Sequence, residues 1–235
     1  MRRIAGIDGC KAGWFVVSAD ATLDSINWFI AENIDSAAHG LRDHVAAGID
    51  IPVGIPDAGP RDCDGLARKR LSPLRGTSVF PAPIRQILKC RDHTEASDRR
   101  ESIDGKRISA QLFHILHKID EVDAYLRYRS ANAPQFYEVH PELAFAALQN
   151  HTPMAHGKRT ATGHAQRLAL LSQSFGEANL NAALATYPRS RVARDDILDA
   201  FAVLLSTRRI VSGKARRVPD ESQFDSAGLE MAIWF

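Results

Sequence analysis

Acidic side chains interrupt short apolar segments of this chain, and they are the residues with the clearest potential for chemistry. Asp8 ends the apolar run of residues 3–7, and Asp50 stands between Ile49 and Ile51. Burying an ionised carboxylate costs free energy unless a partner neutralises it, so packing alone seldom explains aspartate at such positions. Asp8 and Asp50 are therefore candidate catalytic residues.

Other carboxylates fall in or at the ends of the expected structural elements. Glu138 lies in a strand-like segment, and Asp195, Asp196 and Asp199 lie at the start of a helix expected near residues 195–210. Asp196 and Asp199 are three residues apart, so their carboxylates project from one face of that helix. Acidic residues at a helix N-terminus also have a purely structural explanation, because they cap the helix and complement its dipole.

Carboxylates that converge repel one another, and a divalent cation is the usual remedy in proteins. Oxygen-only ligands select Mg²⁺ or Mn²⁺ over zinc. Two such ions about 4 Å apart can activate a water molecule and stabilise the leaving oxygen of a phosphodiester. The predicted catalytic carboxylates are Asp8, Asp50, Asp196 and Asp199. The predicted metal ligands are Asp8, Asp50, Asp199 and Glu138.

The net charge of +2 hides two basic segments. Residues 61–107 hold 12 basic and 7 acidic side chains, and residues 188–217 hold 8 and 3. Such segments can neutralise phosphates where they meet in space, although an ordinary solvated surface is the alternative. The candidate phosphate-binding residues are Lys11, Arg61, Arg68, Arg75, Arg85 and Lys158, with Arg159 beside the last.

His140 follows Glu138 by two positions and is a candidate general base, because an imidazole titrates near neutral pH. A strand-end histidine that bonds to the backbone is the alternative. The three cysteines have no CxxC spacing, so a zinc site is not expected. No nucleophile-elbow motif for a catalytic serine stands out either.

The elements that must position these residues alternate between strands and helices. Three strand-like segments with short connections predict an antiparallel meander over residues 3–7, 14–17 and 26–30. A helix capped by Asp35 or Ser36 should run until Gly48, and a very short strand should follow at residues 49–51. A strand, a helix and a strand in this order imply a crossover connection and a parallel pair in one sheet.

Residues 57–107 are rich in Arg, Pro and Gly and lack strand signals, so they predict a helical insertion with short helices near 66–71 and 84–90. After it, Ser109 should cap a helix whose apolar stripe runs to Leu126. The other expected elements are a strand at 136–139, helices at 141–148, 164–175 and 195–210, and an edge strand at 232–235. That last strand would suit the edge of a homodimer. Together these elements predict one α/β domain over residues 1–235.

The composition excludes several classes of protein. The 235 residues are 45% hydrophobic and 25% charged, as in soluble globular proteins. No apolar run approaches the ~20 residues that cross a membrane, and Asp8 interrupts the first one before a signal-peptide core forms. Three widely spaced cysteines predict no disulfide framework. A cytoplasmic enzyme with no membrane partner is the expected class.

Several motifs resemble those of the domain-of-unknown-function family 429, whose members are described as predicted nucleases with a ribonuclease H-like fold. The most specific are residues 6–14 (GIDGCKAGW) and residues 49–56 (IDIPVGIP). The resemblance continues in order along the chain at residues 61–64, 75–83, 138–142, 157–160 and 195–200.

This resemblance implies a mixed sheet, made of an antiparallel meander plus parallel strands and flanked by helices. In ribonuclease H-like nucleases the catalytic carboxylates come from the first strand, the fourth strand and a late helix, and the matching positions here are Asp8, Asp50 and Asp199. RuvC-type resolvases usually have glutamate in the fourth strand, so the shorter Asp50 would alter the spacing of a metal pair. The implied partner is nucleic acid.

Two other functions stay open. A non-catalytic module that binds nucleic acid or protein could retain the fold, although the intact carboxylate set argues against it. A phosphotransferase of the sugar-kinase and actin type would use the turn Asp8-Gly9-Cys10-Lys11 to bind phosphate. The 235 residues do not hold the two full lobes of such proteins.

Overall fold

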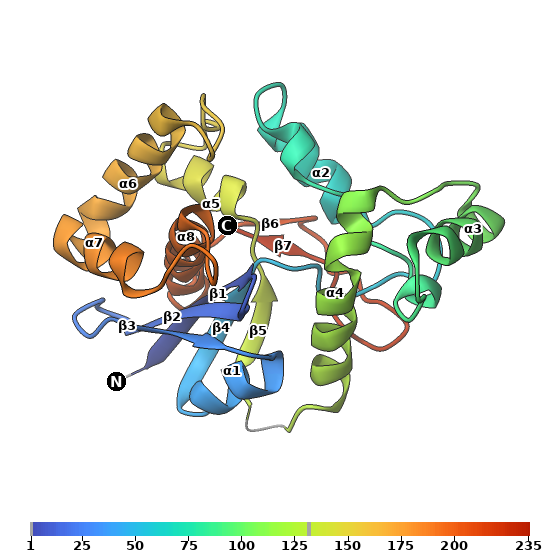
Figure 1. Ribbon diagram of the computed structural model, residues 1–235, viewed down its shortest axis with the longest axis horizontal. Helices are drawn as coiled ribbons and strands as arrows, with labels where there is room; N and C mark the ends of the chain where they lie inside the picture. The colour runs from blue at the N-terminus through green and yellow to red at the C-terminus, as the bar shows by residue number, and fades with distance from the viewer. Residues whose placement is uncertain (1, 131–132) are drawn as a thin grey trace.

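The computed structural model describes residues 2–130 and 133–235 (Figure 1). Its centre is a five-stranded sheet in the order β3-β2-β1-β4-β5. β2 is antiparallel to both β1 and β3, whereas β4 is parallel to both β1 and β5. The strands are β1 Arg3–Cys10, β2 Gly13–Asp20, β3 Asn27–Ala31, β4 His44–Ile49 and β5 Gln135–Glu138. The predicted meander followed by parallel strands is confirmed.

Helices cover both faces of this sheet (Figure 1). On one face, α1 (Ile34–Gly40) and α4 (Ala110–Tyr128) share an apolar cluster with Ala5 and Ile7 of β1. The other face, which we call the α8 face, is covered by α8 (Arg194–Val211), which packs on β1, β2 and β4. Against α8 lie α5 (Pro141–Leu148), α6 (Ala161–Phe175) and α7 (Glu177–Thr186). This mixed sheet between helices is consistent with a ribonuclease H-like arrangement, as the sequence predicts.

Residues 57–107, all of which the structure describes, form an insertion without a strand. It carries α2 (Asp62–Leu71) and α3 (His93–Asp104), and two single 3₁₀ turns at Gly76–Ser78 and Arg85–Ile87. The helix expected near 84–90 is thus only a turn. α3 was not predicted, because its sequence is mostly charged and offers no apolar stripe. Across the described ranges, no helix is long and apolar enough to cross a membrane.

The first crossover differs from the prediction in where its helix ends. Asn33 caps α1 by accepting a hydrogen bond from the Ser36 amide, and the helix stops at Gly40 rather than Gly48. β4 already begins at His44, because the strand must pair with β1 from its first residues onward. α7 was not predicted either. It follows α6 directly after Gly176, whose φ angle is positive (73°).

The C-terminal segment forms a small second sheet of β6 (Arg217–Val218) and β7 (Ile233–Trp234). β7 also meets the end of β5, where Trp234 bridges to Val139. Ile233 and the terminal Phe235 are buried within the chain. This segment therefore does not present the open edge on which the predicted homodimer was based.

Candidate functional site

Two parallel neighbours in the sheet, β1 and β4, lead into the same three residues, Gly-Ile-Asp. In their register Gly6 lies opposite Gly48. The Asp50 amide donates a 3.0 Å hydrogen bond to the Ile7 carbonyl. Because side chains alternate along a strand, the two isoleucines face α1 and α4, and Asp8 and Asp50 face α8. The register thus places both carboxylates on the α8 face, at neighbouring strand ends.

The two glycines allow α8 to approach the sheet closely. A Cβ atom on Gly6 would overlap the Ala200 carbonyl oxygen and the backbone of Leu204. A Cβ atom on Gly48 would lie 2.8 Å from Val203 Cγ1. The acidic residues one turn earlier in α8 are Asp196 and Asp199. The close helix therefore brings these two carboxylates to the ends of β1 and β4.

The four carboxylates form a cluster with few partners, in which Asp8 and Asp199 are buried and Asp50 and Asp196 are partly exposed. Asp8 and Asp199 are only 6% and 1% exposed. Within the described ranges the side chains of Asp8 and Asp50 have neither a hydrogen bond nor an ion pair. Burial, followed by the charges of Asp50 and Asp199, raises the pKa of Asp8 well above its usual value. Burial and the Asp199 charge raise the pKa of Asp50 to about 7, and burial raises the pKa of Asp196 to about 6.

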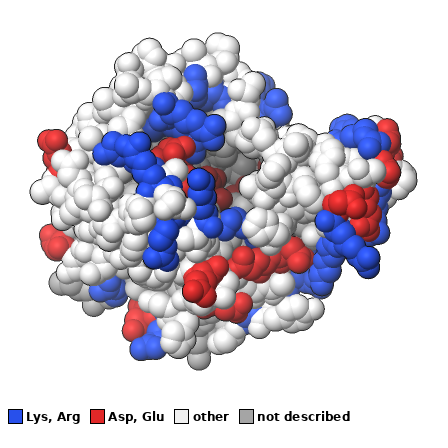
Figure 2. All heavy atoms as spheres, in the orientation of Figure 1, with Lys and Arg blue, Asp and Glu red and all other residues white. Residues whose placement is uncertain are grey.

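A hollow is visible on the molecular surface between the part that carries α6, α7 and α8 and the part that carries α2, α3 and α4 (Figure 2). Acidic atoms lie inside this hollow, and lysine and arginine side chains surround it. This arrangement of charge suits a phosphate-bearing ligand that approaches a carboxylate centre.

Lys158, in the loop before α6, contacts this carboxylate cluster directly. Its Nζ atom lies 2.6 Å from Asp199 Oδ2 and 3.6 Å from Asp195 Oδ2. Burial alone would lower the pKa of Lys158, but the charges of Asp199 and Asp8 outweigh burial and raise the pKa above its usual value. Lys158 therefore stays charged, yet one ammonium cannot neutralise four carboxylates.

The donor set suits a hard divalent cation in charge and in ligand type. Every candidate ligand is a carboxylate oxygen, which Mg²⁺ and Mn²⁺ prefer. Glu142 Oε2 adds a buried oxygen without a hydrogen-bond partner, and the Glu142 charge acts on Asp50. The spacing is less complete, because no three Asp, Glu, His or Cys side chains in the described part of the chain lie close enough together to hold a metal ion. Side chains would have to rotate to complete a coordination shell.

Glu138, the fourth predicted metal ligand, does not join the cluster. It lies opposite Ile49 in the β4–β5 register, so its side chain faces away from α8. Arg61 binds both of its carboxylate oxygens, at 2.7 and 2.9 Å, and also pairs with Asp64 at 2.5 Å. The Arg61 guanidinium is therefore paired inside the protein, and Arg61 is not brought to the cluster as a phosphate contact.

Arg85, another predicted phosphate contact, is also occupied by internal partners. Its guanidinium forms 2.6 Å ion pairs with both Asp123 and Asp225. These partners join the insertion to α4 and to the C-terminal segment. The geometry gives Arg85 a role in holding these parts of the chain together.

The remaining predicted phosphate contacts keep their charge available. Arg75 forms no ion pair with a described residue, and its Nη1 atom lies 3.3 Å from the position that a Cβ on Gly157 would take, next to Lys158. Arg68 on α2 and Lys11 in the β1–β2 turn are exposed and, among the residues described, likewise unpaired. Arg75 is thus the one of these three that lies beside the loop of Lys158.

His140, the candidate general base, uses both ring nitrogens in local contacts. Its Nδ1 atom accepts a hydrogen bond from the Glu142 amide, which caps α5, and its Nε2 atom lies 3.3 Å from the Ser78 carbonyl. Burial lowers the pKa of His140, so the ring stays neutral near pH 7. These contacts match the backbone-bonded alternative.

Two residues beside the cluster were not predicted. Glu142, in the first turn of α5, binds Arg167 at 2.6 Å through Oε1 and keeps Oε2 free. Lys118 of α4 donates a 2.6 Å hydrogen bond to the Gly13 carbonyl, and its charge acts on Cys10 near Asp8. The sequence held a signal for Lys118, because this residue stands at helical spacing from the apolar residues of α4.

Replacing Asp50 by Asn should change how the stability of the metal-free protein depends on pH. The pKa of Asp50 is about 7, so between about pH 4 and pH 7 the folded state holds a proton that the unfolded state has released. Wild-type stability therefore falls as pH rises through that window, and in Asp50→Asn this fall should shrink by about 4 kcal/mol. Urea unfolding with a metal chelator at both ends of the window measures the difference.

The matched control for this experiment is Asp220→Asn. Asp220 is exposed two residues after β6, and its side chain has no hydrogen bond or ion pair with a described residue. This variant should keep the wild-type dependence on pH. An equally steep fall in Asp50→Asn would show that Asp50 ionises independently of its neighbours.

The chain matches the model of a protein family described as "Protein of unknown function (DUF429)" over residues 6–223. No curated protein and no solved structure matches it significantly. The matched range contains Asp8, Asp50, Asp199 and Lys158, so the cluster lies within the part that carries the family pattern. Since the match covers most of the 235 residues, this chain belongs to the DUF429 family.

Proposed function

We propose that this protein is a divalent-metal-dependent phosphodiesterase that acts on nucleic acid. The observation that carries the proposal is the cluster of Asp8, Asp50, Asp196 and Asp199, in which Asp8 and Asp199 are buried and whose ionised forms would outnumber the single ammonium of Lys158 by three. A buried excess of this kind is costly unless a cation or protons offset it.

In this proposal, some residues of the chain bind the metal ion and others fix the position of its ligands. Asp8, Asp50 and Asp199 would hold Mg²⁺ or Mn²⁺, and Glu142 Oε2 is a further oxygen at the same site. A bound ion of this type polarises a phosphoryl oxygen and lowers the pKa of a water molecule. Asp196 accepts a hydrogen bond from the Ala193 amide, which fixes the start of α8 and with it the position of Asp199.

The basic residues near the cluster indicate a phosphate-bearing substrate. Lys158 and Arg75 lie on the same side of the site, and Arg75 has no carboxylate partner among the residues that the structure describes. Cationic side chains of this kind position a nucleic acid through its backbone without reading its sequence. The charge pattern therefore favours a polynucleotide, and it is equally compatible with DNA and RNA.

Cleavage assays test this proposal directly. Labelled single-stranded, duplex and branched DNA and RNA are incubated with the protein and Mg²⁺, Mn²⁺ or a chelator. Metal-dependent cleavage of one of these substrates is the expected result. Calorimetric titration with Mn²⁺ gives a second, independent readout. Absence of both cleavage and Mn²⁺ binding would overturn the proposal.

The second candidate function is a non-catalytic module that binds nucleic acid. The 2.6 Å ion pair between Lys158 and Asp199 favours it, because the lysine already supplies a cation at one of the candidate metal ligands. Oligonucleotide binding that is unchanged by chelator, together with no cleavage, would identify this function.

A further inference from the structure

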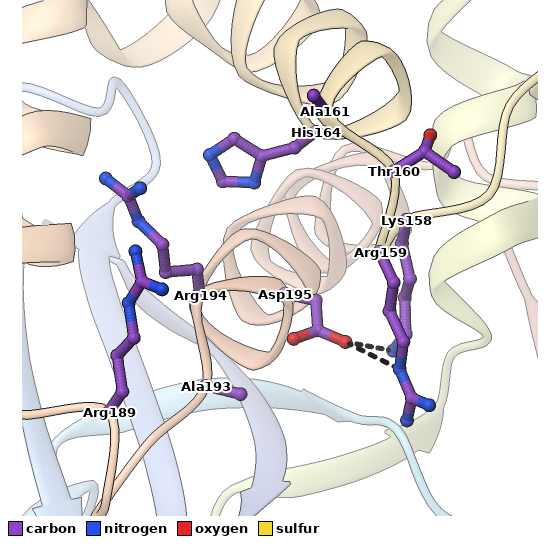
Figure 3. Close-up of a pocket in the computed structure, with 9 residues that line it drawn as sticks. All are labelled: Lys158, Arg159, Thr160, Ala161, His164, Arg189, Ala193, Arg194 and Asp195. Atoms are coloured by element: carbon purple, nitrogen blue, oxygen red, sulfur yellow. Dashed lines mark ion pairs between the residues drawn. The ribbon is translucent and has the colours of Figure 1, made fainter.

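A second site adjoins the carboxylate cluster and shares only Lys158 with the chemistry proposed above. It is a cavity of about 580 Å³ that lies where the loops before α6 and α8 meet (Figure 3). Four of its lining residues are basic, and one is acidic: Lys158, Arg159, Arg189, Arg194 and Asp195. We call this cavity the basic pocket.

The charges on the two sides of the basic pocket are not equally satisfied. On one side Asp195 Oδ2 lies 3.6 Å from Lys158 Nζ and 4.0 Å from Arg159 Nε (Figure 3). On the other side Arg189 and Arg194 are exposed and have no ion pair or hydrogen bond through their side chains in the described chain. The pocket therefore keeps at least two uncompensated positive charges.

The two free arginines and His164 all line the basic pocket (Figure 3). Burial and then the charges of Arg194 and Arg189 lower the pKa of His164, as expected when cations crowd an imidazole. Guanidinium groups in one cavity repel each other unless an anion offsets their charge, and planar guanidinium groups match phosphate oxygens well.

The backbone around the basic pocket adds to the same preference. Thr160 immediately precedes α6 and Ala193 immediately precedes α8, and both residues line the cavity. The N-terminus of a helix carries a partial positive charge that favours anions. Ala193 has no side-chain oxygen to cap α8, so it leaves this end of the helix open to an external acceptor.

Lys158 joins the basic pocket to the carboxylate cluster, because it lines the cavity and also binds Asp199. We infer that the basic pocket holds a phosphate group of a nucleic acid strand while a neighbouring phosphodiester of the same strand lies at the carboxylates. This inference rests on the proposed function for the second half of its statement, whereas phosphate binding in the pocket stands without it.

Binding measurements on the metal-free protein test phosphate binding in the basic pocket separately from the proposed function at the carboxylates. The probe is a fluorescent single-stranded oligonucleotide of about ten nucleotides, close to the length that single-strand binding folds cover. The arms of the experiment use a strand with a 5′-phosphate, one with a 3′-phosphate, one with neither, and inorganic phosphate as competitor. A preference for one terminal phosphate assigns the pocket to a strand end, and equal affinities assign it to an internal phosphate.

Arg194→Gln should weaken oligonucleotide binding about tenfold, because it removes one charge-assisted contact. The pair Arg189→Gln and Arg194→Gln should weaken it further and lower the dependence of affinity on salt by about one to two released counterions. Both side chains are exposed, so melting temperatures should stay close to that of the wild type.

Arg191→Gln is the matched control. Arg191 is exposed and lies close to both arginines in the sequence. Its Cζ atom lies over the Tyr187 ring, 5.8 Å from the ring centre, and Arg191 does not line the basic pocket. Its variant should bind as the wild type does. Wild-type affinity and salt dependence in the double variant would overturn the inference, as would no oligonucleotide binding by the wild type at low salt.

The outcomes keep this inference distinct from the proposed function. If the double variant cleaves as the wild type does, the metal-dependent centre is retained and the basic pocket is not part of the path of its substrate. If the wild type never cleaves and the double variant loses oligonucleotide binding, the basic pocket is retained and the phosphodiesterase activity is rejected.

Discussion

Asp8→Asn should lower the rate of metal-dependent cleavage by a factor of about 10³ or more, because metal-ion stabilisation of a phosphoryl transfer is worth several kcal/mol. Asp8 lies near the end of β1 at the centre of the carboxylate cluster and has no partner of its own in the described chain. An amide at this position keeps the shape of the side chain and removes the charge that would bind the ion. Single-turnover cleavage at saturating Mn²⁺ measures the loss.

The same variant gives a second readout that does not depend on catalysis. The charges of Asp50 and Asp199 oppose ionisation of Asp8, so an uncharged residue there should raise the melting temperature of the metal-free protein near pH 8. Added Mn²⁺ should stabilise the wild type and leave Asp8→Asn nearly unchanged. Asp220→Asn, whose carboxylate is exposed and unpaired among the described residues, should behave as the wild type in both experiments. Wild-type cleavage by Asp8→Asn would exclude it as a metal ligand.

Gly6→Ala should destabilise the protein by about 3 kcal/mol or more, because the added methyl group has no space. Its Cβ atom would lie 2.9 Å from Leu204 Cα and closer still to the Ala200 carbonyl oxygen. Both obstacles are backbone atoms of α8, so a change of side-chain rotamer cannot relieve the overlap. The helix would have to move away from β1 and carry Asp199 away from Asp8. Urea unfolding monitored by circular dichroism measures the loss.

Gly65→Ala in α2 is the control for backbone effects. Gly65 lies inside a helix, and a Cβ atom there would have no heavy atom within 4 Å. This variant should gain about 0.5–1 kcal/mol, as expected for Gly to Ala in a helix. A fully stable Gly6→Ala that still binds Mn²⁺ would show that close approach of α8 is not required for the cluster.

The sequence predicted the order of strands and the main helices because their signals are local. Apolar runs mark β1, β2 and β3, and the apolar stripe of α4 repeats at helical spacing. The errors also have local causes. Residues 44–47 fit a helical spacing and a strand about equally well, and pairing with β1 decided for the strand. α3 buries few apolar side chains, so nothing in its pattern indicated a helix.

Predictions about single site residues succeeded or failed according to whether the face of a strand could be inferred. Asp8 and Asp50 could be paired, because both follow Gly-Ile at a strand end. Glu138 and Arg61 are 77 positions apart, and their bidentate ion pair has no signature in the sequence. The register of β5 against β4 alone determines that Glu138 points away from α8. The spatial neighbours of an arginine depend on the whole fold, so Arg61 and Arg85 could not be separated from Arg75 beforehand.

By itself, the sequence determined which residues could form an acidic centre, because an aspartate in an apolar strand needs a reason that packing does not supply. It also determined the family, through motifs that run along most of the chain. Only the tertiary structure decided that Asp8, Asp50, Asp196 and Asp199 meet, that Glu138 does not, and that Lys158 lies between the cluster and the basic pocket. The physical reason is distance: electrostatic interactions act over a few ångströms, and the separation of residues far apart in the chain is set by strand register and by the close approach of α8 to Gly6 and Gly48.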